Sequence, residues 1–283
     1  MRTFQRITSI VLVLVGAATL AVGIVLWWAD SHLFDTEAVL DTTDDVLTSP
    51  DVQALLTARI TTRVMEQVGD ESFRNQVAEI VGEAVADAEV QALVKDGVRT
   101  AHRLLVDDDA EQIPLRLDSL SREIRANVIA EVPDLAGVLP PTDDILTFDL
   151  LERSDLPPVW RLADRFHDTA ALLISVGAVI VGLALVIGPA RWIRLVVGGV
   201  TFAAFGFVGI VALGRAIAVV EDRITDPIAV AATRDIFDAF FTSLDTMSIA
   251  MIVAGLLAAM FGVAIRLMRP EYSLRSRNPT PWG

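Results

Sequence analysis

The hydrophobic residues of this chain fall into four long uncharged runs, separated by stretches that are rich in charge. The runs cover residues 7–28, 169–189, 195–214 and 246–265. An α-helix rises about 1.5 Å per residue, so about 20 residues cross the hydrocarbon core of a bilayer. We therefore predict four transmembrane helices.

The first run follows Arg2 and Arg6 and has to be compared with a cleavable signal peptide. It is too long for the apolar part of such a peptide, and no small-residue cleavage site follows it. It ends in Trp27 and Trp28, and tryptophans gather at membrane interfaces. The run is therefore predicted to be an uncleaved signal anchor.

Small residues recur within the runs at the four-residue spacing that lets membrane helices approach closely. The pairs are Ala178/Gly182, Gly199/Ala203, Gly255/Ala259 and Ala258/Gly262. We expect some of these faces to form helix contacts, although glycine and alanine are common in any membrane helix.

Charge is distributed unevenly along the chain, whose formal net charge is −14. Segment 29–168 holds 30 acidic and 12 basic residues, a net charge of −18, and segment 215–245 has a net charge of −3. The remaining polar segments together carry +7. Arginine-rich loops stay in the cytoplasm, so we predict cytoplasmic termini, acidic segments outside and a location in the cell (plasma) membrane.

The predicted organisation follows from these spans and charges. It consists of a cytoplasmic N-terminus (1–6), transmembrane helix 1 (7–28), an acidic extracytoplasmic helical domain (29–168), transmembrane helix 2 (169–189), a cytoplasmic turn (190–194), transmembrane helix 3 (195–214), an extracytoplasmic helical loop (215–245), transmembrane helix 4 (246–265) and a basic cytoplasmic tail (266–283).

Segment 29–168 carries its apolar residues at helical spacing. Ser49 and Pro50 are a typical helix start, Gly69 is a typical helix end, and Asp70 can cap the next helix. The apolar stripes run from Val52 to Val68, from Phe73 to Val85, from Val90 to Leu105 and from Leu117 to Val132. No convincing strand alternation is present. The fold class is therefore predicted to be all-α, with an extracytoplasmic α-helical bundle between the first two of the four transmembrane helices.

Helical spacing also continues from the outer segments into the membrane. It runs from Val159 into the second apolar run and from Pro227 into the fourth. We expect continuous helices across both boundaries.

A short sequence recurs within the helical domain. Val52-Gln53-Ala54-Leu55 is repeated 38 residues later as Val90-Gln91-Ala92-Leu93. Two further identities keep this offset, namely Thr62 with Thr100 and Val39 with Val77. The matches fit a duplicated helical hairpin, but a chain rich in alanine and valine also produces them by coincidence, and the sequence does not decide between the two.

Four acidic residues are a weak candidate for a calcium site. Asp107, Asp109, Glu111 and Asp118 fall at positions 1, 3, 5 and 12 of a calcium-binding loop. Position 6 needs glycine and has Gln112, and position 12 has the shorter Asp in place of Glu. A solvated acidic loop between helices is the alternative.

Six residues near the predicted outer membrane face are candidates for contact with lipid headgroups. They are Trp27, Trp28, His32, Arg161, Arg165 and His167. His32 and His167 could meet there, and ordinary interfacial side chains are the alternative. The three histidines of the chain lack the spacing of metal ligands.

Several kinds of chemistry are excluded because the sequence lacks the residues or motifs that they need. It has no cysteine, which excludes disulfides, thiolate metal sites and thiol nucleophiles. The motifs of serine hydrolases, nucleotide binding and dinucleotide binding are absent from it, so no cofactor is predicted. The charge of the acidic domain repels nucleic acid.

A family resemblance is present in segments 33–38 (LFDTEA) and 47–53 (LTSPDVQ) and in the helix that follows to Val68. In these segments the chain resembles a family of actinobacterial multi-pass integral membrane proteins with no assigned activity. The layout is similar over nearly the whole length. The resemblance implies four spans with an extracytoplasmic helical domain, and it implies no site residues.

The leading hypothesis is a non-enzymatic cell-envelope membrane protein whose acidic extracytoplasmic helical domain is an interaction or assembly module. Its expected partners are the lipid bilayer and either another envelope protein or further copies of the chain. A transport or channel component is the alternative. The runs contain no ionisable residue to mark a transport path, but a pore formed by an oligomer escapes this argument. An envelope enzyme with an unrecognised carboxylate site is the second alternative.

Overall fold

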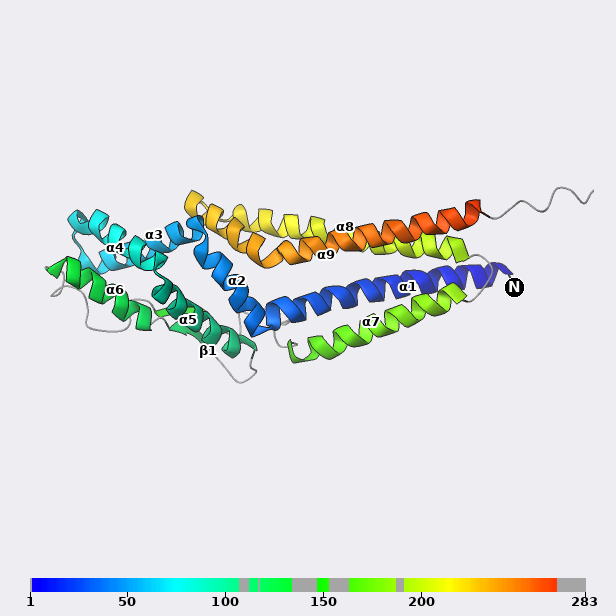
Figure 1. The fold of residues 1–283 in the computed structure, drawn as a ribbon, viewed down its shortest axis with the longest axis horizontal. Coiled ribbons are helices and arrows are strands. Elements are labelled where there is room, and N and C mark those ends of the chain that lie inside the picture. The colour runs from blue at the N-terminus through cyan, green and yellow to red at the C-terminus, as the bar shows by residue number, and fades with distance from the viewer. Residues whose placement is uncertain are drawn as a thin grey trace, which may run out of the picture. The chain divides into compact units, whose positions relative to one another are not determined.

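The computed structural model describes residues 2–106, 112–116, 118–133, 147–152, 163–186 and 191–268, and this part of the chain is predominantly helical, as its periodicity predicts (Figure 1). The elements in chain order are α1 (Arg2–Ala29), the π-helix η1 (Asp30–Phe34), α2 (Thr36–Thr48), α3 (Pro50–Val68), the 3-10 turn η2 (Glu71–Phe73), α4 (Arg74–Ala86), α5 (Ala88–Val106), β1 (Gln112–Arg116), α6 (Asp118–Glu131), β2 (Thr147–Glu152), α7 (Ala163–Val186), α8 (Arg191–Glu221) and α9 (Pro227–Leu267).

Four helical stretches are long and apolar enough to cross a membrane, in agreement with the four predicted spans. They are Ile7–Phe34, His167–Val186, Arg191–Glu221 and Pro227–Leu267. Large apolar side chains lie exposed along them, including Leu172 at 61%, Phe207 at 61% and Met260 at 67%. Apolar surface of this extent is typical of contact with lipid.

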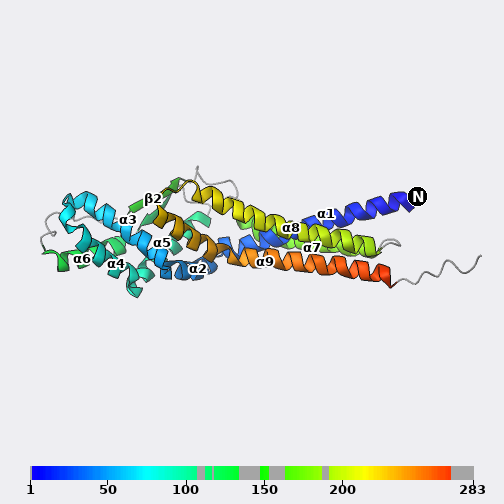
Figure 2. The ribbon, with the colours of Figure 1, turned by 90° about the horizontal axis from the view of Figure 1, so that it is seen from above.

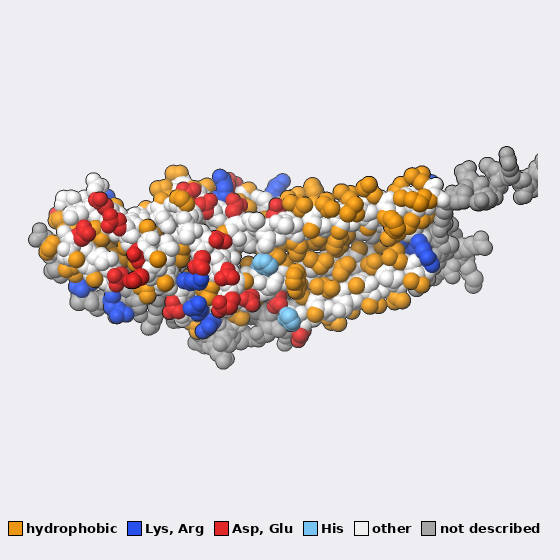
Figure 3. Space-filling view, viewed as in Figure 1, with side chains coloured by type: hydrophobic (Ala, Val, Ile, Leu, Met, Phe, Trp, Pro, Cys, Tyr) orange, Lys and Arg blue, Asp and Glu red, His pale blue; other side chains and the backbone are white. Residues whose placement is uncertain are grey.

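The chain divides into two compact units. The apolar unit comprises Met1–Val25, Asp168–Ala212 and Leu244–Gly283, and the acidic unit comprises Leu26–His167 and Leu213–Ser243. Figure 3 shows hydrophobic side chains over the visible face of the apolar unit, and many acidic with some basic side chains over that of the acidic unit.

Glycines hold α8 and α9 together within the apolar unit, where the two helices lie along each other (Figure 2). A Cβ atom on Gly199 would lie 2.3 Å from the carbonyl oxygen of Gly255, and one on Gly255 would lie 2.4 Å from that of Gly199. Gly255 also approaches Ala203, and Gly199 approaches Ala259. The two predicted faces Gly199/Ala203 and Gly255/Ala259 therefore pack against each other, at a distance that only glycine allows.

Glycines also bring α1 and α7 close together. Cβ atoms on Gly16 and Gly23 would lie 2.8 Å from atoms of Ile180 and Ile174 respectively. By contrast, no described atom lies within 4 Å of a Cβ built on Gly182, so the predicted Ala178/Gly182 face makes no such close contact in the described part of the chain.

The acidic unit has its own hydrophobic core, formed by α3, α4, α5 and α6. The buried members are Ile60, Val64, Met65, Val77, Ile80, Val81, Ala84, Val85, Val90, Ile124, Val128 and Val132. They belong to the predicted apolar stripes, so the helical reading of this segment is confirmed. The end of α3 is also as expected, because Gly69 adopts a left-handed conformation with φ of 71° and its amide donates to the Met65 carbonyl at 2.9 Å.

The 38-residue repeat extends to the helices themselves. Helices α2 and α4 both have 13 residues, and α3 and α5 both have 19, each pair being offset by 38 positions. The residues between the helices, Ser49 and Asp87, both have extended backbones and cap the helix that follows.

Side-chain hydrogen bonds repeat with the same offset. Gln53 Nε2 donates to the Leu47 carbonyl at 2.9 Å, and Gln91 Nε2 donates to the Val85 carbonyl at 3.3 Å. The amides of Val52 and Val90 each donate to the capping side chain three residues earlier, both at 3.3 Å. This agreement favours duplication of a helical hairpin over coincidence.

Two short strands depart from the all-helical expectation. β1 and β2 form an antiparallel pair in which Gln112 lies opposite Glu152 and Arg116 opposite Thr147, with an irregular register at Ile113/Pro114. The strands are only five and six residues long, and Pro114 lacks the amide proton of a regular ladder. An alternation this short and interrupted does not stand out in the sequence.

The long helices continue past the predicted membrane runs. α9 is one helix from Pro227 to Leu267, as the spacing predicts, and α8 begins at Arg191, so that residues 191–194 of the expected turn are helical. Val159, where the other continuous helix was expected to begin, lies outside the described residues.

Candidate functional site

An acidic groove on the acidic unit is the candidate site. It has a volume of about 280 Å³ and lies where the end of α4, the start of α5 and one side of α6 meet. Its lining residues are Ile80, Glu83, Ala84, Asp87, Glu89, Val90, Glu123, Asn127, Ala130 and Glu131. We refer to this site as the acidic groove.

Local structure places the carboxylates of the acidic groove. Asp87 caps α5, and its Oδ1 accepts the amide of Glu89 at 2.7 Å. On α6, Glu123, Asn127 and Glu131 follow one another at four-residue intervals, which places them on one side of the helix. The turn geometry at the start of α5 and the periodicity of α6 therefore direct acidic side chains to the same groove.

The floor of the acidic groove belongs to the hydrophobic core. Ile80, Ala84 and Val90 line the groove and are only 4–6% exposed. The groove is therefore backed by the packed core of the acidic unit.

The electrostatics of the acidic groove favour cations. Five of its ten lining residues carry carboxylates, and all five are exposed, while no lysine or arginine is among the described residues that line it. No group of three His, Cys, Asp or Glu side chains in the described part of the chain is arranged to hold a metal ion. The clustered carboxylates give the groove a negative potential that attracts cations.

The residues of the calcium candidate fall largely outside the described part of the chain. Asp107, Asp109 and Glu111 lie outside the described residues. Asp118 is the first residue of α6, and only its backbone is described.

The paired tryptophans of the interface candidates have different surroundings. Trp27 is 52% exposed, whereas Trp28 is 4% exposed. The Trp28 indole donates to Ser243 Oγ at 2.9 Å, and its ring lies beside Phe241 with centroids 5.8 Å apart. Trp28 therefore packs inside the acidic unit, and Trp27 is the member of the pair that presents its ring outward.

The histidines of the interface candidates occupy neighbouring but separate positions. His32 stacks on Trp28 with centroids 5.5 Å apart, and His167 Nδ1 lies 2.8 Å from an oxygen of Asp30. His167 thus contacts η1 two residues from His32. Of the remaining candidates, Arg161 lies outside the described residues and only the backbone of Arg165 is described.

The third histidine, His102, links elements of the acidic unit through its two ring nitrogens. It is 7% exposed; its Nε2 lies 2.9 Å from the Leu33 carbonyl oxygen and its Nδ1 lies 3.1 Å from the Thr36 hydroxyl. A carbonyl only accepts, so Nε2 carries a proton and donates to Leu33, while Nδ1 is paired with the Thr36 hydroxyl. His102 thereby joins α5 to η1 and α2.

Sequence reasoning missed the acidic groove as a site. A signal was present in part, because Glu123, Asn127 and Glu131 form the polar side of a stripe whose apolar side was recognised. The position of Glu83 and Asp87 opposite them depends on how α4 packs against α6, and the sequence pattern does not contain that information.

Comparisons of the chain with protein-family models, with curated proteins and with solved structures found no match.

Proposed function

We propose that the chain is a non-enzymatic protein of the cell membrane, with both termini in the cytoplasm, whose acidic unit lies outside and binds a cationic segment of another envelope protein. Four membrane-length helices and the concentration of arginine in the inner segments support this orientation. The observation that carries the proposal is the acidic groove, which combines five exposed carboxylates with a buried apolar floor.

Charge also favours a different protein over a second copy as the occupant of the acidic groove. The two segments proposed to lie outside have net charges of −18 and −3, so two copies repel each other at this surface. A partner with a basic segment is attracted by the same field. Association is then faster at low ionic strength, because salt screens the interaction.

The test is a crosslinking experiment in native membranes. A photo-reactive amino acid replaces Ala130, which lines the acidic groove and is exposed. The triple change Glu83→Gln, Glu123→Gln and Glu131→Gln then removes three carboxylates from the groove. Exposed ion pairs each contribute about 0.2–1 kcal/mol, so we expect the yield of the adduct to fall about tenfold.

The matched control removes the same charge elsewhere. Glu37→Gln, Glu66→Gln and Glu79→Gln change three exposed carboxylates that do not line the acidic groove. The control is expected to retain the adduct. Equal losses in both triple variants would show that total charge, and not the groove, attracts the partner. An adduct with the mass of two chains would assign the groove to self-association instead.

A further inference from the structure

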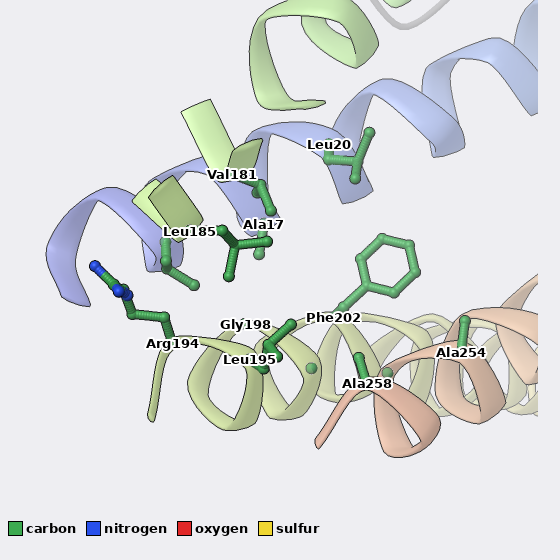
Figure 4. Close-up of a pocket in the computed structure, with 13 residues that line it drawn as sticks. Ala17, Leu20, Val181, Leu185, Arg194, Leu195, Gly198, Phe202, Ala254 and Ala258 are labelled. Carbon is green, nitrogen blue, oxygen red and sulfur yellow. The ribbon is translucent and has the colours of Figure 1, made fainter. Parts of the chain in front are cut away.

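A cavity of about 150 Å³ lies inside the apolar unit, where residues of α1, α7, α8 and α9 meet (Figure 4). Twelve of its 13 lining residues are apolar or glycine, and the exception is Arg194. Figure 4 shows Arg194 at one end of the lining side chains, with Phe202 and Ala254 toward the other end.

Arg194 is unusual because it is both charged and buried. It lies in the first turn of α8 and is 3% exposed. Its neighbour Arg191 is exposed on the same turn. A guanidinium stays charged in proteins and presents several donors in one plane, which suits a phosphate group.

The rest of the cavity suits a hydrocarbon chain. Apolar cavities of about 150 Å³ stay dry and take up apolar molecules. One lining residue, Ala254, is exposed on the surface of α9, so the cavity has an edge on a face that is otherwise apolar. The acyl chain of a membrane lipid can enter from this side without crossing water.

We propose that the cavity is a binding site for an anionic phospholipid, with part of one acyl chain between the four helices and the phosphate held by Arg194. The two ends of the site match the two ends of such a lipid: a cation at the first turn of α8 and hydrocarbon walls along Ala17, Leu195 and Phe202. A zwitterionic lipid has its own cation near the phosphate and gains less from Arg194.

The test uses the full chain in nanodiscs of phosphatidylcholine and a phosphatidylglycerol probe that carries a diazirine on one acyl chain. After illumination, mass spectrometry maps the adducts. We expect them on the segments 194–202 and 254–258, which line the cavity. Unlabelled phosphatidylglycerol is expected to compete, whereas phosphatidylcholine and inorganic phosphate are not.

Two arginines of the same turn provide a matched pair of variants. Arg194→Gln is expected to lower the labelling at these segments at least about tenfold, as loss of a charged hydrogen-bond donor predicts. Arg191→Gln removes the same charge from an exposed side chain that does not line the cavity, and it is expected to lower labelling less than about twofold.

A second pair of variants leaves Arg194 in place and covers the case in which Arg194→Gln does not fold. Ala254→Leu narrows the edge of the cavity, and Ala178→Leu adds the same volume on an exposed position of α7 that does not line the cavity. Only Ala254→Leu is expected to reduce the labelling. Equal effects of the two members of either pair, adducts confined to other segments, or equal competition by phosphatidylcholine would each overturn the proposal.

Discussion

At the scale of single residues, equivalent positions of the 38-residue repeat make different contacts. Val64 and His102 occupy equivalent positions, 38 residues apart, and both are buried, at 2% and 7% exposure. Val64 belongs to the hydrophobic core, whereas His102 bonds Leu33 and Thr36. The same site in the repeat therefore supplies packing in one copy and a polar tie to the preceding segment in the other.

Replacing His102 with valine, the residue at the equivalent position 64, should destabilise the acidic unit. His102→Val restores the residue of the other copy but leaves the Leu33 carbonyl without its donor. We expect a loss of about 1–3 kcal/mol in the free energy of unfolding, which is the cost of a buried polar group without a partner. Thr100→Val is the control, because the Thr100 hydroxyl bonds only to its own helix and is exposed. The measurement is chemical denaturation in detergent, and equal stability of the two variants would contradict a tie at His102.

A second difference between the copies concerns the capping residues. Ser49 and Asp87 both cap a helix, but the Ser49 hydroxyl also donates to the Asp235 carboxylate of α9. Exchanging them should have unequal effects. Ser49→Asp places a carboxylate beside Asp235, at a cost of about 1–4 kcal/mol for two like charges about 4 Å apart.

The reverse exchange is the control. Asp87→Ser keeps a good cap, so a change within about 0.5 kcal/mol is expected. Thermal unfolding of the two variants at low and high salt checks the prediction, since salt should reduce only the cost of Ser49→Asp. Equal costs would show that the bond to Asp235 contributes nothing to stability.

At the scale of helices and strands, close packing in the apolar unit depends on glycine at particular crossings. Gly199 and Gly255 approach each other so closely that neither tolerates a Cβ atom, whereas no atom of the described residues lies within 4 Å of a Cβ built on Gly182. Lipid supplies no hydrophobic drive between helices, and close backbone approach takes its place.

Glycine-to-alanine changes at these sites should therefore have opposite effects. Gly255→Ala puts a Cβ atom 2.4 Å from the Gly199 carbonyl oxygen and is expected to cost about 1–3 kcal/mol as the helices separate. Gly182→Ala meets no described atom within 4 Å and is expected to be neutral, or more stable by up to about 1 kcal/mol, because alanine favours helix. Thermal unfolding in detergent compares them, and a destabilised Gly182→Ala with an unaffected Gly255→Ala would contradict the packing described for α8 and α9.

The sequence predicted some elements well and others not at all, for physical reasons. The four apolar helices could be predicted because hydropathy adds up over about 20 residues. Both ends of α3 could be predicted, because Ser49 and Pro50 are typical of a helix start and Gly69 of a helix end. Helix α2 could not, because its few apolar residues, among them Leu40 and Leu47, lie among many acidic residues and threonines.

Features that depend on tertiary packing could not be predicted from the sequence either. Arg194 is the last residue of the predicted turn 190–194, which was assigned by its charge, whereas the structure places it buried in the first turn of α8. The acidic groove is formed by residues more than 40 positions apart, such as Glu83 and Glu131, and no local pattern brings these together.

At the scale of the whole molecule, the chain combines two surfaces of opposite chemistry. The described apolar unit presents hydrocarbon to its surroundings, and the described acidic unit presents carboxylates. We interpret the first as the membrane anchor and the second as the module that meets a partner. The proposed function requires the acidic groove to face the outside of the cell, since a cytoplasmic groove could not bind a partner in the envelope.

The absence of cysteine from the sequence makes this orientation directly measurable. Single cysteines are introduced as Ala130→Cys in the acidic groove and Met268→Cys at the end of α9, where the side chain is 77% exposed. Intact cells are then treated with a membrane-impermeant maleimide. We predict that the cysteine at position 130 is labelled in intact cells and that the one at position 268 is labelled only after permeabilisation. The reverse pattern would contradict the orientation and, with it, the proposed function.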